Sequence, residues 1–538
     1  MVKSGETLLG ISDGEPSETD EITGHDREAP VGVRGAPRRR RPGTFLAPLV
    51  QSRWAPVAVL VAFGVLLSVA VWPGHLDADA LKQIQQARTG HFNNWWAPII
   101  DWVMRGLFLL GGGPGIVVAV TILTVLLSLY ELLRARLSRW HAALATILVA
   151  VSPPVLGYLT ALQRDVWFGA STLLSYALLV KAVRSSARVR LICAGLSLVA
   201  DWFAMAARQN AIPALIPAVA IALLLLVRRP VAAPERRPVA AGDPAPPRSR
   251  RPGRRPLLIA LLTVVVFGAF YGSQDVLTYH VIGAQRAFPQ QELFEQDLAG
   301  ISLREGVDLL PRAIFPAHNL SVLRRYYRPG TVIPLVAGRG HPLITYTNAT
   351  GDHELEKAWE HAVVHHPVGY FHARWNLWMA EIDWNTDAWA PYHPGIDTNS
   401  LGLTEAFPVF NHFILRYLEA FGTKYLYGGV ITKAWIYLLI SPFLGLSLIR
   451  RRRSFPVRII GFTVLGAFVY TLTFAVAAMA DTFRWNWFLV TVTIVGLVVQ
   501  AAETFEAAVA RRAGERALPP ASGDAGSPLI RASGAEEP

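Results

Sequence analysis

Long runs of apolar residues, separated by short polar stretches, dominate the pattern along this chain. A helix needs about 20 consecutive apolar residues to cross the ~30 Å hydrocarbon core of a membrane. Runs of this kind predict ten membrane-spanning helices, at roughly 54–72, 114–133, 142–162, 167–183, 190–207, 211–227, 257–273, 430–449, 457–480 and 486–502. A shorter apolar stretch at 98–110 predicts a re-entrant or interfacial helix. The predicted fold class is therefore an all-α polytopic membrane protein.

The polar segments between these runs divide the chain into domains. We predict disordered tails at 1–52 and 503–538, and a disordered basic linker at 228–256, because such compositions bury too little apolar surface to fold. The long segment 274–430 differs, since stretches such as HELEKAWEHAVVHH have helical periodicity. It predicts a mostly helical domain between the spans of 53–273 and those of 431–502.

Charge determines the predicted orientation. Only 17% of the residues are charged, against roughly 25% in soluble domains, although the net charge is +12. With a cytoplasmic N-terminus, the inner segments hold about 33 of the 51 Lys and Arg residues and the short outer loops about 6, in agreement with the positive-inside rule. We therefore interpret the basic excess as topology rather than nucleic-acid binding. Both termini are expected in the cytoplasm of a bacterium, with 274–430 outside the inner membrane.

The first outer loop carries two closely spaced carboxylates, Asp77 and Asp79, in the segment WPGHLDADALKQIQQARTG. Two carboxylates at this spacing can face one cavity, where one takes a proton from a sugar hydroxyl and the other orients it. Alternatively, one of them simply caps the helix that ALKQIQQA predicts. The spacing leaves both readings open.

Three further outer turns carry charged or amide side chains at the predicted membrane boundary. They are QRDVW with Arg164 and Asp165, ARQNA with Arg208 and Asn210, and TFRWN with Arg484. Charges at this depth normally turn inward to a partner or a polar cavity, and an arginine fork suits a phosphate. A plain Arg–Asp anchor at the interface is the alternative for the first of these turns. If the helices bundle, the four turns line one cavity.

This combination resembles the GT-C superfamily of integral-membrane glycosyltransferases. An Asp pair in the first outer loop, a helix ending in QA and the aromatic–Pro entry NNWWAPI carry the resemblance, together with the RD, RQN and FRW turns. It implies that Asp77 or Asp79 is the general base. It also implies a polyprenyl-phosphate sugar as donor, its phosphate held by Arg164, Arg208 or Arg484, and a cell-envelope glycan or protein as acceptor.

Other functions and groups stay open at this stage. An O-antigen polymerase or ligase shares the topology and the lipid-linked substrate, and Asp201 within a predicted span keeps a transporter in view. His361 and His365 have a zinc-like spacing, but a third ligand is missing from the pattern. We therefore predict no metal site, and leave open a need for a divalent cation. Membrane lipids are expected partners, and nucleic acid is not.

Overall fold

The computed structural model describes residues 52–227, 254–338, 340–346, 348–384, 392–420, 429–450 and 453–517. Within these ranges the chain forms helices and isolated β-bridges, with no sheet. The main helices of the bundle are α2 (Ala55–Ala70), α3 (Ala78–Thr89), α4 (Pro98–Leu109), α5 (Pro114–Leu133), α6 (Arg139–Val151), α7 (Pro153–Leu159), α8 (Arg164–Val183), α9 (Ala187–Ala207), α10 (Ile212–Val227), α11 (Arg254–Asp275), α17 (Pro408–Glu419), α18 (Ala434–Leu448), α19 (Phe455–Leu472), α20 (Phe474–Ala477) and α21 (Trp487–Ala517). The prediction of an all-helical chain is confirmed for the described residues.

Seven stretches of helix in the described ranges are long and apolar enough to cross a membrane. They are Pro114–Leu133, Arg164–Val183, Ala187–Ala207, Gln209–Val227, Pro256–Val281, Phe455–Ala477 and Trp487–Arg512. An eighth is added if α6 and α7 form one span bent by 76°. The bend follows from Pro153 and Pro154, since a residue before proline is driven out of the helical region and Ser152 has ψ 134°.

The two remaining predicted spans, 54–72 and 430–449, correspond to helices shorter than the prediction. Helix α2 has 16 residues and α18 has 15, which reach about 24 and 22 Å at 1.5 Å per residue. The predicted short helix at 98–110 is α4, with 12 residues.

The last helix differs from the prediction at its end. Helix α21 continues through Ala517, whereas a disordered tail is expected from residue 503. Ion pairs hold the polar extension of this helix, because Glu503 pairs with Arg136 and Arg453. The predicted tail 1–52, except Ser52, lies outside the described residues, as do residues 228–253 of the predicted linker and residues 518–538.

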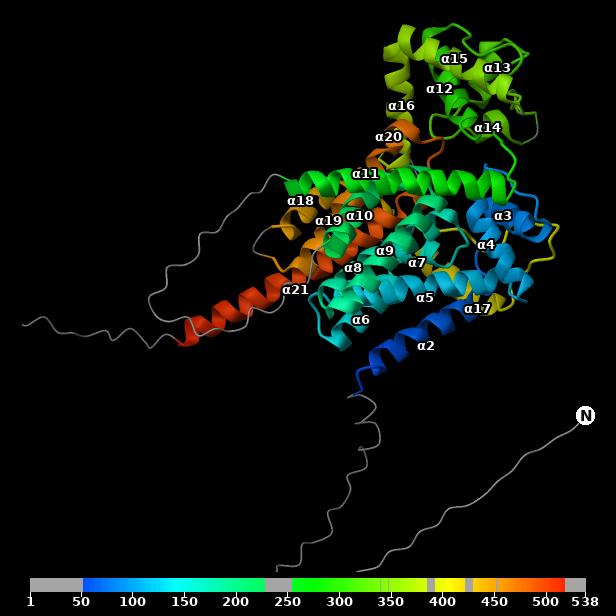
Figure 1. Cartoon of the computed structure of the whole chain (residues 1–538). Helices are drawn as coiled ribbons and strands as arrows, with labels where there is room; N and C mark the ends of the chain where they lie inside the picture. Colours follow the sequence, from blue (N-terminus) through cyan, green and yellow to red (C-terminus); the bar gives the residue numbers. More distant parts are fainter. Residues whose placement is uncertain are drawn as a thin grey trace, which may run out of the picture. The chain divides into compact units, whose positions relative to one another are not determined.

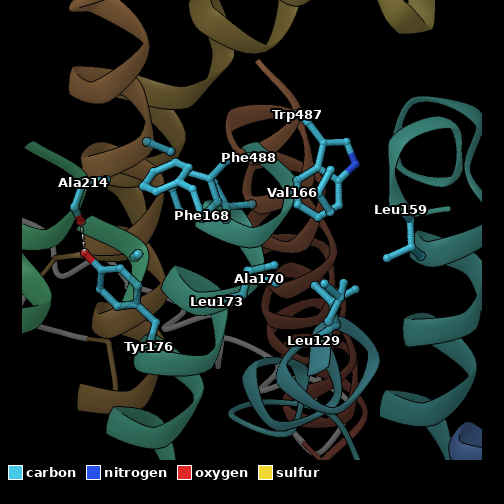
Figure 2. Packing of buried hydrophobic residues seen from close by; sticks show 14 of the residues in the cluster. Leu129, Leu159, Val166, Phe168, Ala170, Leu173, Tyr176, Ala214, Trp487 and Phe488 are labelled. Carbon is cyan, nitrogen blue, oxygen red and sulfur yellow. Dashed lines mark hydrogen bonds between the residues drawn. The ribbon is translucent and has the colours of Figure 1, made fainter. Parts of the chain in front are cut away.

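Aromatic and small side chains interlock in the core of the bundle (Figure 2). The Phe168 ring on α8 lies 4.5 Å from that of Tyr470 and 5.4 Å from that of Phe488. Trp487 is fully buried and donates a hydrogen bond to the Val155 carbonyl over 2.9 Å. The buried Tyr176 hydroxyl donates to the Ala214 carbonyl over 2.8 Å. Helices α7, α8, α10, α19 and α21 are thereby fixed against one another.

A second group of helices has a hydrophobic core of its own. It consists of α12 (Gln291–Glu305), α13 (Leu320–Tyr326), α14 (Ile333–Val336), α15 (Ala349–His365) and α16 (Pro367–Glu381). We call it the α12–α16 domain; Figure 1 shows it beside α20 at one end of the bundle. Its buried core includes Leu298, Ile301, Phe315 and Leu355.

Candidate functional site

The segment before α3 is held in an extended form between two other segments. The amide of His75 donates to the Thr160 carbonyl over 3.0 Å, and that of Leu76 donates to the Gly395 carbonyl over 2.9 Å. These backbone bonds place Asp77 next to the turn that precedes α8.

Asp77 and Asp79 differ in what they do locally. Asp77 is the N-cap of α3, because its Oδ1 accepts the Ala80 amide over 2.8 Å. Its Oδ2 accepts from Arg484 Nη1 over 3.1 Å, whereas Asp79 Oδ2 accepts from Arg484 Nη2 over 2.6 Å. The capping role is therefore confirmed for Asp77, and both aspartates also contact the arginine of a distant turn.

Arg484 is the centre of the site. It lies in a short 3₁₀ helix, Phe483–Trp485, with only 15% of its side chain exposed. Besides the two aspartates, Nη1 donates to Gln163 Oε1 over 2.9 Å, and Nε lies 3.3 Å from Asp165 Oδ2. Burial alone lowers the pKa of Arg484, but the carboxylates outweigh it, so the pKa is raised.

Asp165 joins this arginine to a second one. Its side chain is 1% exposed, and its Oδ1 is paired with Nε of Arg208, the residue that ends α9. The Arg208 guanidinium also lies over the rings of Phe474 and Trp485, at 5.4 and 5.1 Å from their centroids. Asp165 is thus neutralised from two sides, by the turns that follow α9 and α20.

The remaining two predicted residues lie at the edge of this network. Arg164 donates to the Trp95 carbonyl over 3.0 Å and is close enough to Asp79, Asp165, Arg208 and Arg484 for their charges to act on it. Asn210 instead donates to the Thr473 hydroxyl over 3.2 Å. Six of the seven predicted residues therefore converge. We call Asp77, Asp79, Arg164, Asp165, Arg208 and Arg484 the charged cluster.

Several buried donors at the cluster have no hydrogen-bond acceptor among the described residues. Nη2 of Arg208 and Nε2 of Gln163 are two of them. A buried donor without a partner costs about 1–3 kcal/mol, so native structures rarely keep one without an ion, water or ligand. Both donors are suited to an oxyanion.

Glu381, which fixes the turn that carries Arg484, was not predicted from the sequence. This fully buried carboxylate on α16 accepts the Thr482 amide at Oε2 and the Asn486 side-chain amide at Oε1, each over 2.9 Å. Burial raises its pKa well above the ordinary value. A carboxylate in the apolar stretch NLWMAEI was the available signal. The α12–α16 domain thereby positions Arg484.

Two carboxylates one turn apart on α12, Glu292 and Glu295, were also not predicted from the sequence. Burial raises the pKa of Glu292 to about 7; Asp79 adds to this rise, while Arg164 and Arg484 oppose it. Burial likewise raises the pKa of Glu295 to about 8. Glu295 is fully buried, and neither of its oxygens has a hydrogen-bond partner among the described residues. QELFEQD has the composition of an exposed helix start, so the burial of these carboxylates could not be predicted from it.

The described residues hold no group of three or more His, Cys, Asp or Glu side chains arranged to bind a metal. The rings of His361 and His365 stack with their centroids 3.8 Å apart on α15. Asp201 is fully buried in α9, where its electrostatic effect reaches Tyr176 on α8. These three residues take no part in the charged cluster.

An apolar groove of about 400 Å³ runs between α5, α8 and α9. Its lining includes Val120, Trp167, Leu174, Val199 and Phe203. Trp167 follows Arg164 by one helical turn, and its ring stacks on Phe203 with centroids 6.1 Å apart. The groove thus begins one turn from the charged cluster.

No family model, curated protein sequence or solved structure matches this chain.

Proposed function

We propose that this protein transfers a sugar from a polyprenyl-phosphate donor to a hydroxyl of a cell-envelope acceptor. The observation that carries the proposal is the charged cluster. Four segments that are far apart in the sequence bring three arginines and three aspartates together at helix ends. A structural ion pair requires one arginine and one aspartate, whereas binding an anionic substrate with a leaving phosphate requires several charged residues.

The arginines are suited to the phosphate of the donor. A guanidinium binds phosphate oxygens through two parallel hydrogen bonds, and Arg208 already has a buried nitrogen without an acceptor. Negative charge grows on the phosphate as the glycosidic bond breaks, so fixed positive charge lowers the barrier. Arg164, Arg208 and Arg484 supply that charge in this proposal.

The apolar groove is suited to the lipid part of the donor. Its walls are made by α5, α8 and α9, all candidate membrane spans, and Val120 and Val199 on its rim are exposed. A prenyl chain in the groove would bring its phosphate toward Arg164, because Trp167 lies one turn along the same helix. The amphipathic donor would then match an apolar groove that ends at a cationic site.

The proposed topology sets the cellular side of this reaction. We propose ten spans, with α2, α18 and the bent α6–α7 pair completing the seven longer ones, and both termini in the cytoplasm of a bacterial inner membrane. The charged cluster and the α12–α16 domain then lie on the outer side. This is the side on which cell-envelope acceptors are found, as in the GT-C enzymes that the chain resembles.

A carboxylate must take the proton of the acceptor hydroxyl. The sequence proposes Asp77 or Asp79, and Asp79 is the better placed of the two. Both oxygens of Asp77 are engaged by Ala80 and Arg484, whereas Asp79 Oδ1 makes no hydrogen bond to the described residues. Asp77 then serves to cap α3 and to hold Arg484.

The proposal is tested by measuring sugar transfer from polyprenyl-phosphate sugars in membrane vesicles. We expect Arg484→Ala to lower transfer by about 10²–10³-fold, the usual cost of removing one donor to a developing negative charge. Arg164→Ala leaves every ion pair of Arg484 and Arg208 in place, and we expect it to weaken donor binding. Arg88→Ala is the matched control, because among the described residues this exposed arginine on α3 donates only to the Leu401 carbonyl.

Full transfer by both Arg484→Ala and Arg164→Ala would overturn the phosphate site. Transfer of a whole glycan chain in place of a single sugar would instead assign the protein to the polymerases or ligases.

A further inference from the structure

Glu292 on α12 stands out among the carboxylates near the charged cluster. It makes no hydrogen bond or ion pair with the described residues, yet the charges of Asp79, Arg164 and Arg484 all act on it. The residue is only half-buried. It therefore combines closeness to the cluster with partial exposure and a carboxylate that no described partner engages.

Backbone pairing explains how the α12–α16 domain brings Glu292 to this place. The Asn94 amide donates to the Gln285 carbonyl over 3.0 Å, and the Gln285 amide donates to the Phe92 carbonyl over 2.9 Å. One turn after Glu292, Gln296 donates to the carbonyl of Arg328. The start of α12 is thus fixed to the segment that follows α3, next to Trp95, whose carbonyl accepts from Arg164 of the charged cluster.

The three aspartates of the cluster have a disadvantage as bases. Each of them is paired with Arg484, and Asp165 is also paired with Arg208. Taking up a proton would cost each aspartate an ion pair with a buried arginine, which is unfavourable. Glu292 has no ion pair to lose.

The charge balance of the site also favours Glu292 over the aspartates as the base. The charged cluster holds three cations and three anions, so an ionised Glu292 adds an uncompensated negative charge beside the donor phosphate. A proton from the acceptor removes this charge. Of the neighbouring helices, α15 presents Asp352, bonded to Gln290, and α16 presents Arg374, paired with Asp297. Neither of these two residues compensates Glu292.

We propose that Glu292, in place of Asp79, is the carboxylate that takes the proton from the acceptor hydroxyl, an inference that rests on the proposed sugar transfer. The acceptor oxygen forms a bond to the anomeric carbon as the bond from that carbon to the phosphate oxygen breaks. The bonding electrons leave with the polyprenyl phosphate, and the hydroxyl proton passes to Glu292. Asp77 and Asp79 hold Arg484 against the leaving phosphate.

The raised pKa of Glu292, about 7, suits this role. A general base is most effective when its pKa lies near the working pH. Glu295, one turn further along α12, is fully buried.

The experiment compares the full-length wild type with Glu292→Gln, Glu292→Asp and Asp79→Asn in vesicles, from pH 5 to 9. For the wild type we expect kcat to rise with pH around 7. Glu292→Gln should lower kcat by about 10²–10⁴-fold, lose this rise and keep the KM for the donor. Glu292→Asp should restore part of the rate. The exposed Glu360→Gln is the control for folding and assay.

Asp79→Asn should raise the KM for the donor and keep the rise around pH 7. The opposite result, a loss of kcat in Asp79→Asn and a near-normal Glu292→Gln, would overturn the inference in favour of Asp79. Infrared difference titration of wild type against Glu292→Gln needs no activity, and a carboxyl that titrates near 4.5 would also overturn it. Absence of any transfer by the wild type, with a carboxyl that titrates near 7, would instead count against the proposed function.

Discussion

At the scale of single residues, Glu295 predicts a pH dependence of stability. Its folded-state pKa of about 8 lies above the ordinary value of 4.5 for a glutamate, so the folded protein holds a proton that the unfolded chain releases. Stability is therefore fully present below about pH 4.5 and is lost as the pH rises toward 8, at about 1.4 kcal/mol per unit.

Glu295→Gln should abolish this loss of stability with rising pH. We expect the thermal midpoint of the wild type in detergent to fall more steeply than that of Glu295→Gln between pH 5 and 8. The midpoints should be similar near pH 5, because both side chains are then neutral. Glu360→Gln, an exposed change on α15, should follow the wild type. Parallel curves for wild type and Glu295→Gln would show that the Glu295 carboxyl titrates normally.

Single residues also show how far the sequence predicts the site. Arg484, Asp77 and Asp165 are recognisable because each is a charge at the edge of an apolar run, where a buried partner is expected. Arg484 pairs with all three aspartates because of the way α3, α8 and α21 pack. No local sequence pattern indicates this packing. Glu292 shows the opposite case, since its surroundings come entirely from contacts made by other segments.

At the scale of elements, α16 connects the α12–α16 domain to the cluster. Its last residue, Glu381, uses both carboxylate oxygens as acceptors for the 482–486 turn. In Glu381→Gln one oxygen becomes an amide nitrogen, so that one of the two hydrogen-bond donors of the turn faces another donor. We expect a loss of about 1–3 kcal/mol in stability and a fall in transfer activity, because Arg484 loses its fixed position.

The measurement pairs a thermal midpoint with the transfer assay. Glu305→Gln on α12 is the control, since that carboxylate is one-third exposed and makes only a weak contact with His366, at 3.8 Å. Equal midpoints for Glu381→Gln and Glu305→Gln would mean that α16 does not hold the turn.

The elements themselves are the best-predicted level of this structure. Each predicted span has a helical counterpart, because an apolar run of this length admits no other structure in lipid. The differences occur where a local feature acts against the run. Pro153 and Pro154 break one span in two, and Glu503 finds two arginine partners that extend α21 past its apolar end.

At the scale of the whole molecule, the orientation of the bundle decides which compartment the charged cluster faces. Glu381 ties the cluster to the α12–α16 domain, so both lie on one side of the bundle. The excess of Lys and Arg in the opposite loops predicts that this side is extracytoplasmic. The lone Cys193 is buried and can be replaced by serine, which leaves a background for engineered cysteines.

We expect a cysteine at position 350, in the α12–α16 domain, to react with a membrane-impermeant maleimide in spheroplasts. A cysteine at position 240, between α10 and α11, should react only after the membrane is opened. A cysteine at position 512, at the end of α21, is the control for the inner side, because α21 leads away from the Arg484 turn. Reaction of 350 and 240 from the same side would contradict the ten-span topology. It would also remove the reason to expect a cell-envelope acceptor, because the charged cluster would then no longer be assigned to the outer side of the membrane.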